Sequence, residues 1–320
     1  MRPVRPMRAL RPTGSPATLV ATLCAMALVA VAAILWLPGG SGHGQAQQQA
    51  PDPRIGVPGA PAGWTTVFGD NFQGRAGTAP NSATWAHDTG PGSSFTSGNV
   101  QTYTDRTANT HLDGNGDLVI TAQKTGSAWT SGRIRSTAEV AAPAGGELQV
   151  TASIEQPAPA SALGYWDAFW LLGPGQWPGT GEIDILENVN ALAATSGTFH
   201  CGVRPAGPCD EPNGISSGLL PCPGCETGFH TYSVLIDRRT PGQESITWSV
   251  DGRRFFHVAE SQFPAATWQQ AVDHGFTVIL DLAIGGGYPD AACHCTTPTP
   301  ATSSGGELKV AYVAAYAESP

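Results

Sequence analysis

Apolar positions of the chain fall in short runs without a sustained helical period, and this pattern predicts β-strands rather than helices. No long amphipathic helical period is visible, and strand-forming residues fall in short runs such as 182–187 and 197–200. The chain has 40 glycines and 27 prolines, which together make 67 of its 320 residues, far above average usage. The pattern therefore predicts an all-β fold of many short strands joined by turns.

One run, 181–187, places three carboxylates on a strand that otherwise reads as buried. Its isoleucines and its leucine are strand formers, and strict alternation puts Glu182 and Asp184 on one face. Glu187 falls out of step, because a period of two turns it to the opposite face. A β-bulge at 185–186 would return Glu187 to the face of the other two acids, and bulges are enriched beside active sites.

Three carboxylates on one face suit the hydrolysis of a glycosidic bond. A retaining glycosidase needs one ionised carboxylate to attack the anomeric carbon and one protonated carboxyl to release the leaving oxygen. Three crowded acids do not all ionise near neutral pH, and we expect the retained proton mainly on Glu187. The alternatives for the same run are an exposed acidic strand on a solvated sheet face and a calcium site.

Aromatic side chains gather in the sixteen residues before the first acid, at Trp166, Phe169, Trp170 and Trp177. Sugar rings stack their C–H faces on aromatic planes, although at least one of these rings is expected in the core. His200, on the predicted strand that follows, offers an imidazole near the same face. A lone histidine is more often structural than catalytic, so this residue alone does not decide the function.

The acidic run resembles the bulged E-x-D-x-x-E signature of glycoside hydrolase family 16, in its laminarinase-like branch. Seven further segments are similar to that family and follow in the expected order, so the resemblance extends over residues 64 to 318. These segments are 67–72, 99–104, 118–122, 130–134, 229–234, 246–252 and 280–286.

The resemblance implies a retaining endo-hydrolase of β-linked glucans or galactans, built as a β-jelly-roll sandwich of two antiparallel sheets with a concave substrate cleft. Carried over by position, Glu182 is the nucleophile, Glu187 is the general acid/base and Asp184 is the assisting carboxylate. From the residues alone, Arg133 reads equally well as a surface strand charge and Asn99 as a turn residue. The positions that line the substrate cleft in the family match Asn99, Arg133, Trp166, Trp170, Trp177, His200 and Tyr288.

Three positions depart from the family pattern. Asp281 and Tyr288 stand where many relatives carry Asn and Trp, which leaves the subsite preference open. Ala311 stands where relatives often have an Asp that helps to bind a structural calcium. We expect no cofactor and no catalytic metal, and Ala311 makes a structural calcium doubtful without excluding it.

The N-terminal segment predicts a targeting sequence. Four arginines precede an apolar run at 17–37, and a small-x-small sequence follows at 44–46. Residues 1–46 are therefore expected to be a signal peptide or, because 21 apolar residues span a bilayer, a membrane anchor. Both alternatives predict an extracellular protein, either secreted or anchored to the outer face of the membrane. We expect a flexible spacer at 47–63 and a single catalytic domain at 64–320.

Charge narrows the range of partners. Beyond residue 46 the chain has 12 basic and 25 acidic residues, a net charge of −13. This balance argues against nucleic acid and anionic membrane surfaces and suits a neutral β-glucan polysaccharide. No interface signal stands out, so we expect a monomer that touches a membrane only if its N-terminal segment is kept as an anchor.

An even number of cysteines in an extracellular domain predicts three disulfides. Their spacing does not fix the pairing, although 201 and 209, and 293 and 295, lie close in sequence. The alternative is a zinc site formed by Cys222, Cys225, Cys293, His294 and Cys295. The six cysteines are Cys201, Cys209, Cys222, Cys225, Cys293 and Cys295.

Three functions compete at this point. The first is a secreted endo-β-glucanase that cleaves β-1,3 or mixed β-1,3/1,4 linkages. The second is a β-glucan-recognition protein that uses the same sandwich without turnover, which the presence of all three acids disfavours. The third is a cell-wall transglycosylase, which shares the covalent intermediate and differs only in what intercepts it.

Overall fold

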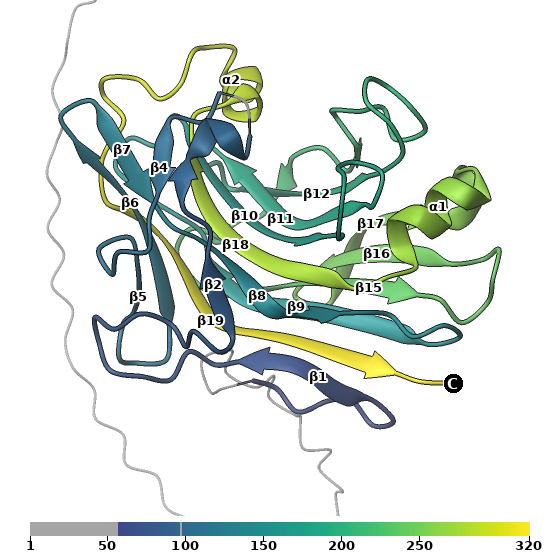
Figure 1. Ribbon diagram of the computed structural model, residues 1–320. Coiled ribbons are helices and arrows are strands. Elements are labelled where there is room, and N and C mark those ends of the chain that lie inside the picture. The colour runs from purple at the N-terminus through teal and green to yellow at the C-terminus, as the bar shows by residue number, and fades with distance from the viewer. Residues whose placement is uncertain (1–56, 97) are drawn as a thin grey trace, which may run out of the picture. The chain divides into compact units, whose positions relative to one another are not determined.

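The computed structural model describes residues 57–96 and 98–320, and Figure 1 shows how their elements are arranged. Almost all of the regular structure in this part of the chain is strand. The strands form two sheets in which neighbours run antiparallel, apart from the parallel pair β4 (Gln101–Tyr103) and β7 (Ala128–Ser131). The predicted all-β architecture is confirmed.

The larger sheet has eleven strands among the described residues. Its main path runs β17, β16, β15, β9, β19, β6, β7, β4, β3, with β1 beside β19 and β5 beside β6. The remaining bounds are β1 Thr65–Asp70, β3 Gly90–Pro91, β5 Thr110–Leu112, β6 Leu118–Thr125, β9 Glu147–Glu155, β15 His230–Asp237, β16 Ser245–Val250, β17 Arg253–Ala259 and β19 Gly306–Glu318.

The smaller sheet has eight strands in the same part of the chain, in the order β13, β12, β11, β10, β18, β8, β2, with β14 beside β12. This sheet is curved, as β10 and β18 show in Figure 1. Its strands are β2 Trp85–His87, β8 Arg133–Val140, β10 Tyr165–Leu172, β11 Glu182–Val189, β12 Ala194–His200, β13 Ile215–Ser216, β14 Leu220–Pro221 and β18 Phe276–Ile284.

The hydrophobic core lies on one face of the smaller sheet only. Along β10, Tyr165 and Phe169 are fully buried in the main core cluster, which draws on both sheets. Ala168 and Trp170 belong to a separate small cluster with Ile279 of β18. Side chains of a strand point alternately to opposite faces, so these three residues lie on the face turned away from the core. That second face is available for a functional site.

The predicted bulge is present in β11. Two adjacent residues of β10, Phe169 and Trp170, pair with Leu186 and Asp184, which leaves Ile185 as an extra residue. The pairing of β11 with β12 shifts its register in the same place. Two residues of β11 occupy the space of one there, so the third carboxylate of the run returns to the face of the other two.

Helices are few and short among the described residues. They are α1 (Ala265–Val272), α2 (Gly287–Cys293) and two 3-10 turns, η1 (Gly92–Ser94) and η2 (Glu260–Gln262). No helix in this part of the chain combines the length and the apolar character that a membrane span requires. The predicted targeting segment 1–46 lies outside the described residues, so it stays a prediction.

The predicted spacer 47–63 overlaps the described residues from position 57 onward, and there the structure differs from a flexible linker. Val57 and Ala60 pack against a cluster of β19 that includes Tyr316. The hydroxyl of Tyr316 donates a hydrogen bond of 2.6 Å to the carbonyl of Pro58. The few apolar side chains of this segment find a surface to cover, and the folded unit therefore includes residues from 57.

The six cysteines form three disulfides, as predicted. Each bridge closes a short loop: Cys201–Cys209, Cys222–Cys225 and Cys293–Cys295. With these residues paired, the described residues hold none of the free thiols on which the alternative zinc site depended, and that hypothesis is wrong.

Candidate active site

One register row across the smaller sheet carries several polar side chains. Glu187 of β11 pairs with Ala168 of β10, Ala168 pairs with Asp281 of β18, and Asp281 pairs with Arg133 of β8. In the other direction, Glu187 pairs with Ser196 of β12. Directly paired residues of antiparallel strands share a face. The row therefore crosses five strands on the face that is turned away from the core.

The other two acids lie beside His200. Glu182 is the direct partner of His200 across β11 and β12. The imidazole Nε2 lies 3.3 Å from Asp184 Oδ2 and 3.7 Å from Glu182 Oε1. The structure thus brings the three predicted carboxylates and the predicted histidine together on one face.

Burial and mutual repulsion keep protons on this cluster. Burial, and then the charge of Asp184, raises the pKa of Glu182 to about 8. The same two causes raise the pKa of Glu187 well above its usual range. Glu182 has the imidazole of His200 beside it, whereas none of the ion pairs among the described residues includes Glu187. This asymmetry favours the retained proton on Glu187, which stays a prediction.

His200 is the cation of the cluster. Burial disfavours its charged form, but the carboxylates of Asp184 and Glu211 beside its two ring nitrogens outweigh burial and raise its pKa to about 11. The ligand atoms of Glu182, Asp184 and His200 lie within 4.8 Å of one another. A protonated imidazole has no lone pair to offer a metal. Held in its protonated form, His200 makes this group a charge cluster, whereas a neutral His200 would leave Glu182, Asp184 and the imidazole as three potential metal ligands.

Two aromatic residues enclose Glu187. The indole N–H of Trp166 donates a hydrogen bond of 2.9 Å to Glu187 Oε1. The ring of Tyr288 meets the ring of Trp166 edge-on at 5.8 Å, and its hydroxyl lies 3.0 Å from Ser196 Oγ. Burial, and then the charge of Glu187, raises the pKa of Tyr288 to about 12. These contacts leave the second oxygen of Glu187 to carry the proton.

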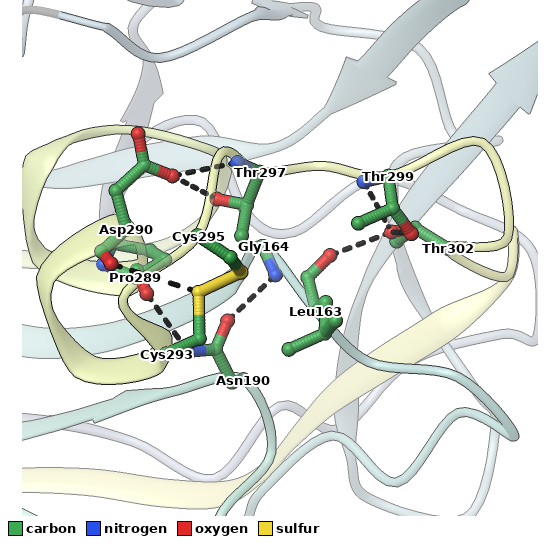
Figure 2. The surroundings of a disulfide bond; sticks show 10 residues. All are labelled: Leu163, Gly164, Asn190, Pro289, Asp290, Cys293, Cys295, Thr297, Thr299 and Thr302. Carbon is green, nitrogen blue, oxygen red and sulfur yellow. Dashed lines mark hydrogen bonds between the residues drawn. A yellow bond between two sulfur atoms is a disulfide. The ribbon is translucent and has the colours of Figure 1, made fainter. Parts of the chain in front are cut away.

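The segment that holds Tyr288 is fastened to the end of the acidic strand (Figure 2). Asn190, directly after β11, accepts a hydrogen bond of 2.7 Å from the amide of Gly164 and donates one of 3.0 Å to the carbonyl of Pro289. The disulfide Cys293–Cys295 closes the far end of α2. Strand β11 and the aromatic residues around Glu187 therefore form one connected unit.

Arg133 and Trp170 form a second group on the same face. The guanidinium lies 4.6 Å from the ring centroid of Trp170 and 4.9 Å from that of Phe95, and it donates a hydrogen bond of 3.0 Å to Asp88. The indole of Trp170 donates one of 2.8 Å to Asp281. Trp170 is thus buried against the site rather than in the core, and the surface-charge alternative for Arg133 is wrong.

The two remaining predicted residues lie at the edges of this face. Asn99 donates a hydrogen bond of 2.6 Å to a carbonyl of the glycine run. A Cβ on Gly286 would lie 2.8 Å from the side-chain amide nitrogen of Asn99 and 3.2 Å from the ring of Trp166. The absence of a side chain at Gly286 therefore lets Asn99 and Trp166 lie this close to the glycine backbone. The ring of Trp177 lies 5.6 Å from that of His200. Every predicted site residue is therefore in the same neighbourhood.

Sequence reasoning overlooked two parts of this site. Tyr103 donates a hydrogen bond of 2.5 Å to the second oxygen of Asp281, so that carboxylate ties β4 to β10 and β18. The sequence signal for this contact was Asp281 itself, a single acid inside the otherwise apolar strand β18. Glu211, which contacts His200, lies in a loop that has no strand pattern, and no local signal distinguishes it.

Replacing Asp281 by Ala is expected to lower the free energy of unfolding by about 3–5 kcal/mol, since it removes the buried acceptor of two donors, Tyr103 and Trp170. Guanidinium denaturation followed by tryptophan fluorescence measures this loss. Asp105→Ala, at an exposed position, is the matched control. A loss below about 1 kcal/mol would show that the network carries no structural weight.

Comparison with known proteins places the chain. A family model described as "XgeA-like, catalytic GH16 domain" matches residues 94–211, which include the acidic run. The solved structure of the endo-1,3-β-glucanase from Streptomyces sioyaensis is 44% identical, with a TM-score of 0.78 over 82% of this chain and 100% of that chain. This chain belongs to glycoside hydrolase family 16.

Named relatives of this family 16 chain include the β-glucanase of Rhodothermus marinus, 28% identical over 70% of this chain and 77% of the relative. The glucan endo-1,3-β-glucosidase A1 of Niallia circulans is 26% identical over 83% of this chain, but the match covers only 40% of that longer protein. The predicted jelly-roll sandwich and the laminarinase-like resemblance are thereby confirmed.

Proposed function

We propose that the protein is a retaining endo-glycosidase that hydrolyses β-1,3 or mixed β-1,3/1,4 glucans. The observation that carries this proposal is the bulge of β11, which places three carboxylates on one face, with the imidazole of His200 in ion-pair contact with Asp184 and Glu182. The family membership and the names of the relatives at 44% and 28% identity support β-glucan as the substrate.

In the first step, Glu182 reacts in its ionised form, which the charge of His200 favours against the rise of its pKa to about 8. The carboxylate attacks the anomeric carbon, and the bond from that carbon to the leaving oxygen breaks. The proton of Glu187 passes to the leaving oxygen, so the departing sugar leaves as a neutral alcohol. In the second step, the carboxylate of Glu187 takes a proton from water, and the resulting hydroxide equivalent displaces Glu182 from the anomeric carbon. Both carboxyl groups return to their starting protonation states.

The surroundings of the two glutamates suit these roles. The imidazole of His200 lies on the side of Glu182, where negative charge is needed at the start of the reaction. The indole of Trp166 holds Glu187 by one oxygen, so the other is free to transfer a proton. Asp184 lies between them in sequence, and its charge raises the pKa of Glu187 and thereby favours its protonated form.

We further propose that the domain acts outside the cell, either secreted or anchored to the outer face of the membrane. Three disulfides in one domain are typical of an oxidising environment. The basic and apolar N-terminal segment provides a route of export, whether or not it is later removed.

A panel of purified polysaccharides tests the substrate proposal. Laminarin, curdlan, barley β-glucan, lichenan, agarose and galactan are incubated with the protein, and the products are resolved by size. We expect a rapid release of short oligosaccharides from the β-1,3-containing glucans. Binding without new reducing ends on any polymer would indicate a recognition protein, and products longer than the starting chains would indicate a transglycosylase.

A further inference from the structure

Glu211 is a buried carboxylate next to the catalytic acids that the chemistry above leaves without a role. Its side chain is 0% exposed. One oxygen lies 2.9 Å from His200 Nδ1, and the other accepts a hydrogen bond of 3.0 Å from the amide of Cys201. Each carboxylate oxygen therefore has a partner. One partner is the side chain of His200, and the other is a backbone amide.

The loop that carries Glu211 is closed on itself. The disulfide Cys201–Cys209 begins at the residue after His200. Ala206 and Glu211 exchange two backbone hydrogen bonds of 2.6 and 2.5 Å. A Cβ on Gly214 would lie 2.8 Å from Cε1 of the imidazole, so the backbone at this glycine packs against the ring edge. These constraints leave the carboxylate and the imidazole little freedom to move apart.

The other charged groups around the imidazole come from two elements. From β11, Asp184 and Glu182 face Nε2 at 3.3 and 3.7 Å, and Glu187 adds a third acid farther along the strand. From the closed loop, Arg204 lies 5.9 Å from the ring centroid of Trp177, which itself lies 5.6 Å from the imidazole. The imidazole thus bridges a carboxylate of the loop and two carboxylates of the strand.

We propose that Glu211 is a positioning residue, which holds His200 by Nδ1 so that Nε2 donates its proton to the Asp184 and Glu182 side of the cluster. The proposal rests on the proposed function of those acids. A carboxylate on one ring nitrogen fixes both the ring plane and the position of the proton on the other nitrogen. His200 then presents a permanent positive charge to the nucleophile, which favours the ionised form of Glu182.

Removing the charge of Glu211 should narrow the pH range of activity from its alkaline side. The imidazole would lose its proton at a lower pH, so the alkaline limb of kcat/KM would move down. The charge of Glu211 also raises the pKa of Glu182, so its removal offsets the weaker cation and the acid limb is expected to stay in place. A loss of packing alone would lower the rate without moving either limb.

Three variants test this proposal in the full domain. Glu211→Gln keeps the shape and removes the charge, Glu211→Asp keeps the charge, and Asp210→Asn removes an exposed charge from the same loop. We expect Glu211→Gln to lower kcat on laminarin by about 10²-fold, with a narrowed pH profile. We expect Glu211→Asp to retain the positions of both limbs and Asp210→Asn to behave as the wild type.

Nitrogen NMR of the His200 ring gives a second readout that needs no turnover. We expect the wild-type ring to keep both protons up to about pH 11 and the Glu211→Gln ring to titrate closer to the ordinary value of 6.5. Titration of the wild-type His200 ring near pH 6.5 would overturn the proposal. So would a folded Glu211→Gln variant in which both the pH profile of kcat/KM and the titration of the ring match the wild type. If Glu211→Gln does not fold, the proposal is tested by the titration of the wild-type His200 ring and by the pH profile of Glu211→Asp. A wild type that cleaves no β-glucan would refute the proposed function, while the titration still reports on the contact of Glu211 with His200.

Discussion

Replacing Glu182 by Gln is expected to lower kcat on laminarin by at least about 10⁴-fold, because an amide cannot form the glycosyl ester that the first step requires. Gln has nearly the same shape as Glu, so the fold and the binding of the polymer should be retained. Reducing-end assays measure the rate, and affinity electrophoresis in laminarin measures the binding.

The matched control for this variant is Glu139→Gln, since Glu139 is an exposed glutamate of β8, in the same sheet. We expect it to keep wild-type activity. A Glu182→Gln enzyme that retains more than about a tenth of the wild-type rate, with its fold intact, would show that Glu182 does not attack the substrate.

Replacing Glu187 by Ala is expected to lower kcat on laminarin by about 10³-fold, because the leaving oxygen departs without a proton. The change also removes the acceptor of the Trp166 indole and opens space beside the anomeric carbon. Azide should therefore restore turnover of an aryl β-laminaribioside, whose leaving group needs no proton, and the product should be the β-glycosyl azide.

The configuration of the azide product separates the two glutamates. A β-azide from Glu187→Ala means that azide displaced Glu182 from a covalent intermediate of α configuration. An α-azide from the same variant would mean that azide had taken the place of the nucleophile, and the two roles would have to be exchanged. Proton NMR of the isolated product distinguishes the two anomers.

The sequence predicts the catalytic strand in detail because its signals are local. The spacing of Glu187 breaks a period of two, and the structure has the extra residue at Ile185 that this break requires. For the aromatic residues of β10 the sequence predicts only that at least one lies in the core, and the structure places Phe169 there and Trp170 on the opposite face.

The supporting contacts were beyond prediction because they join residues far apart in sequence. Tyr103 and Asp281 meet only when β4 and β18 are folded together, and the sequence therefore indicated Asp281 only as a departure from the family pattern. Glu211 reaches His200 through a loop whose path depends on a disulfide and on backbone pairing. No strand or helix period governs such a loop. The end of the predicted spacer was misplaced for a similar reason, since Val57 packs against the distant strand β19.

The stereochemistry of the first product tests the central claim most directly. The claim is that Glu182 forms a covalent intermediate that water then opens, with two inversions at the anomeric carbon. Proton NMR during the first minutes of hydrolysis of a laminari-oligosaccharide resolves the new reducing end before it mutarotates. With two inversions, the β-anomer forms first and the α-anomer grows in later. An α-anomer as the first product would mean a single inversion by direct attack of water, and it would contradict the assignment of Glu182 as the nucleophile.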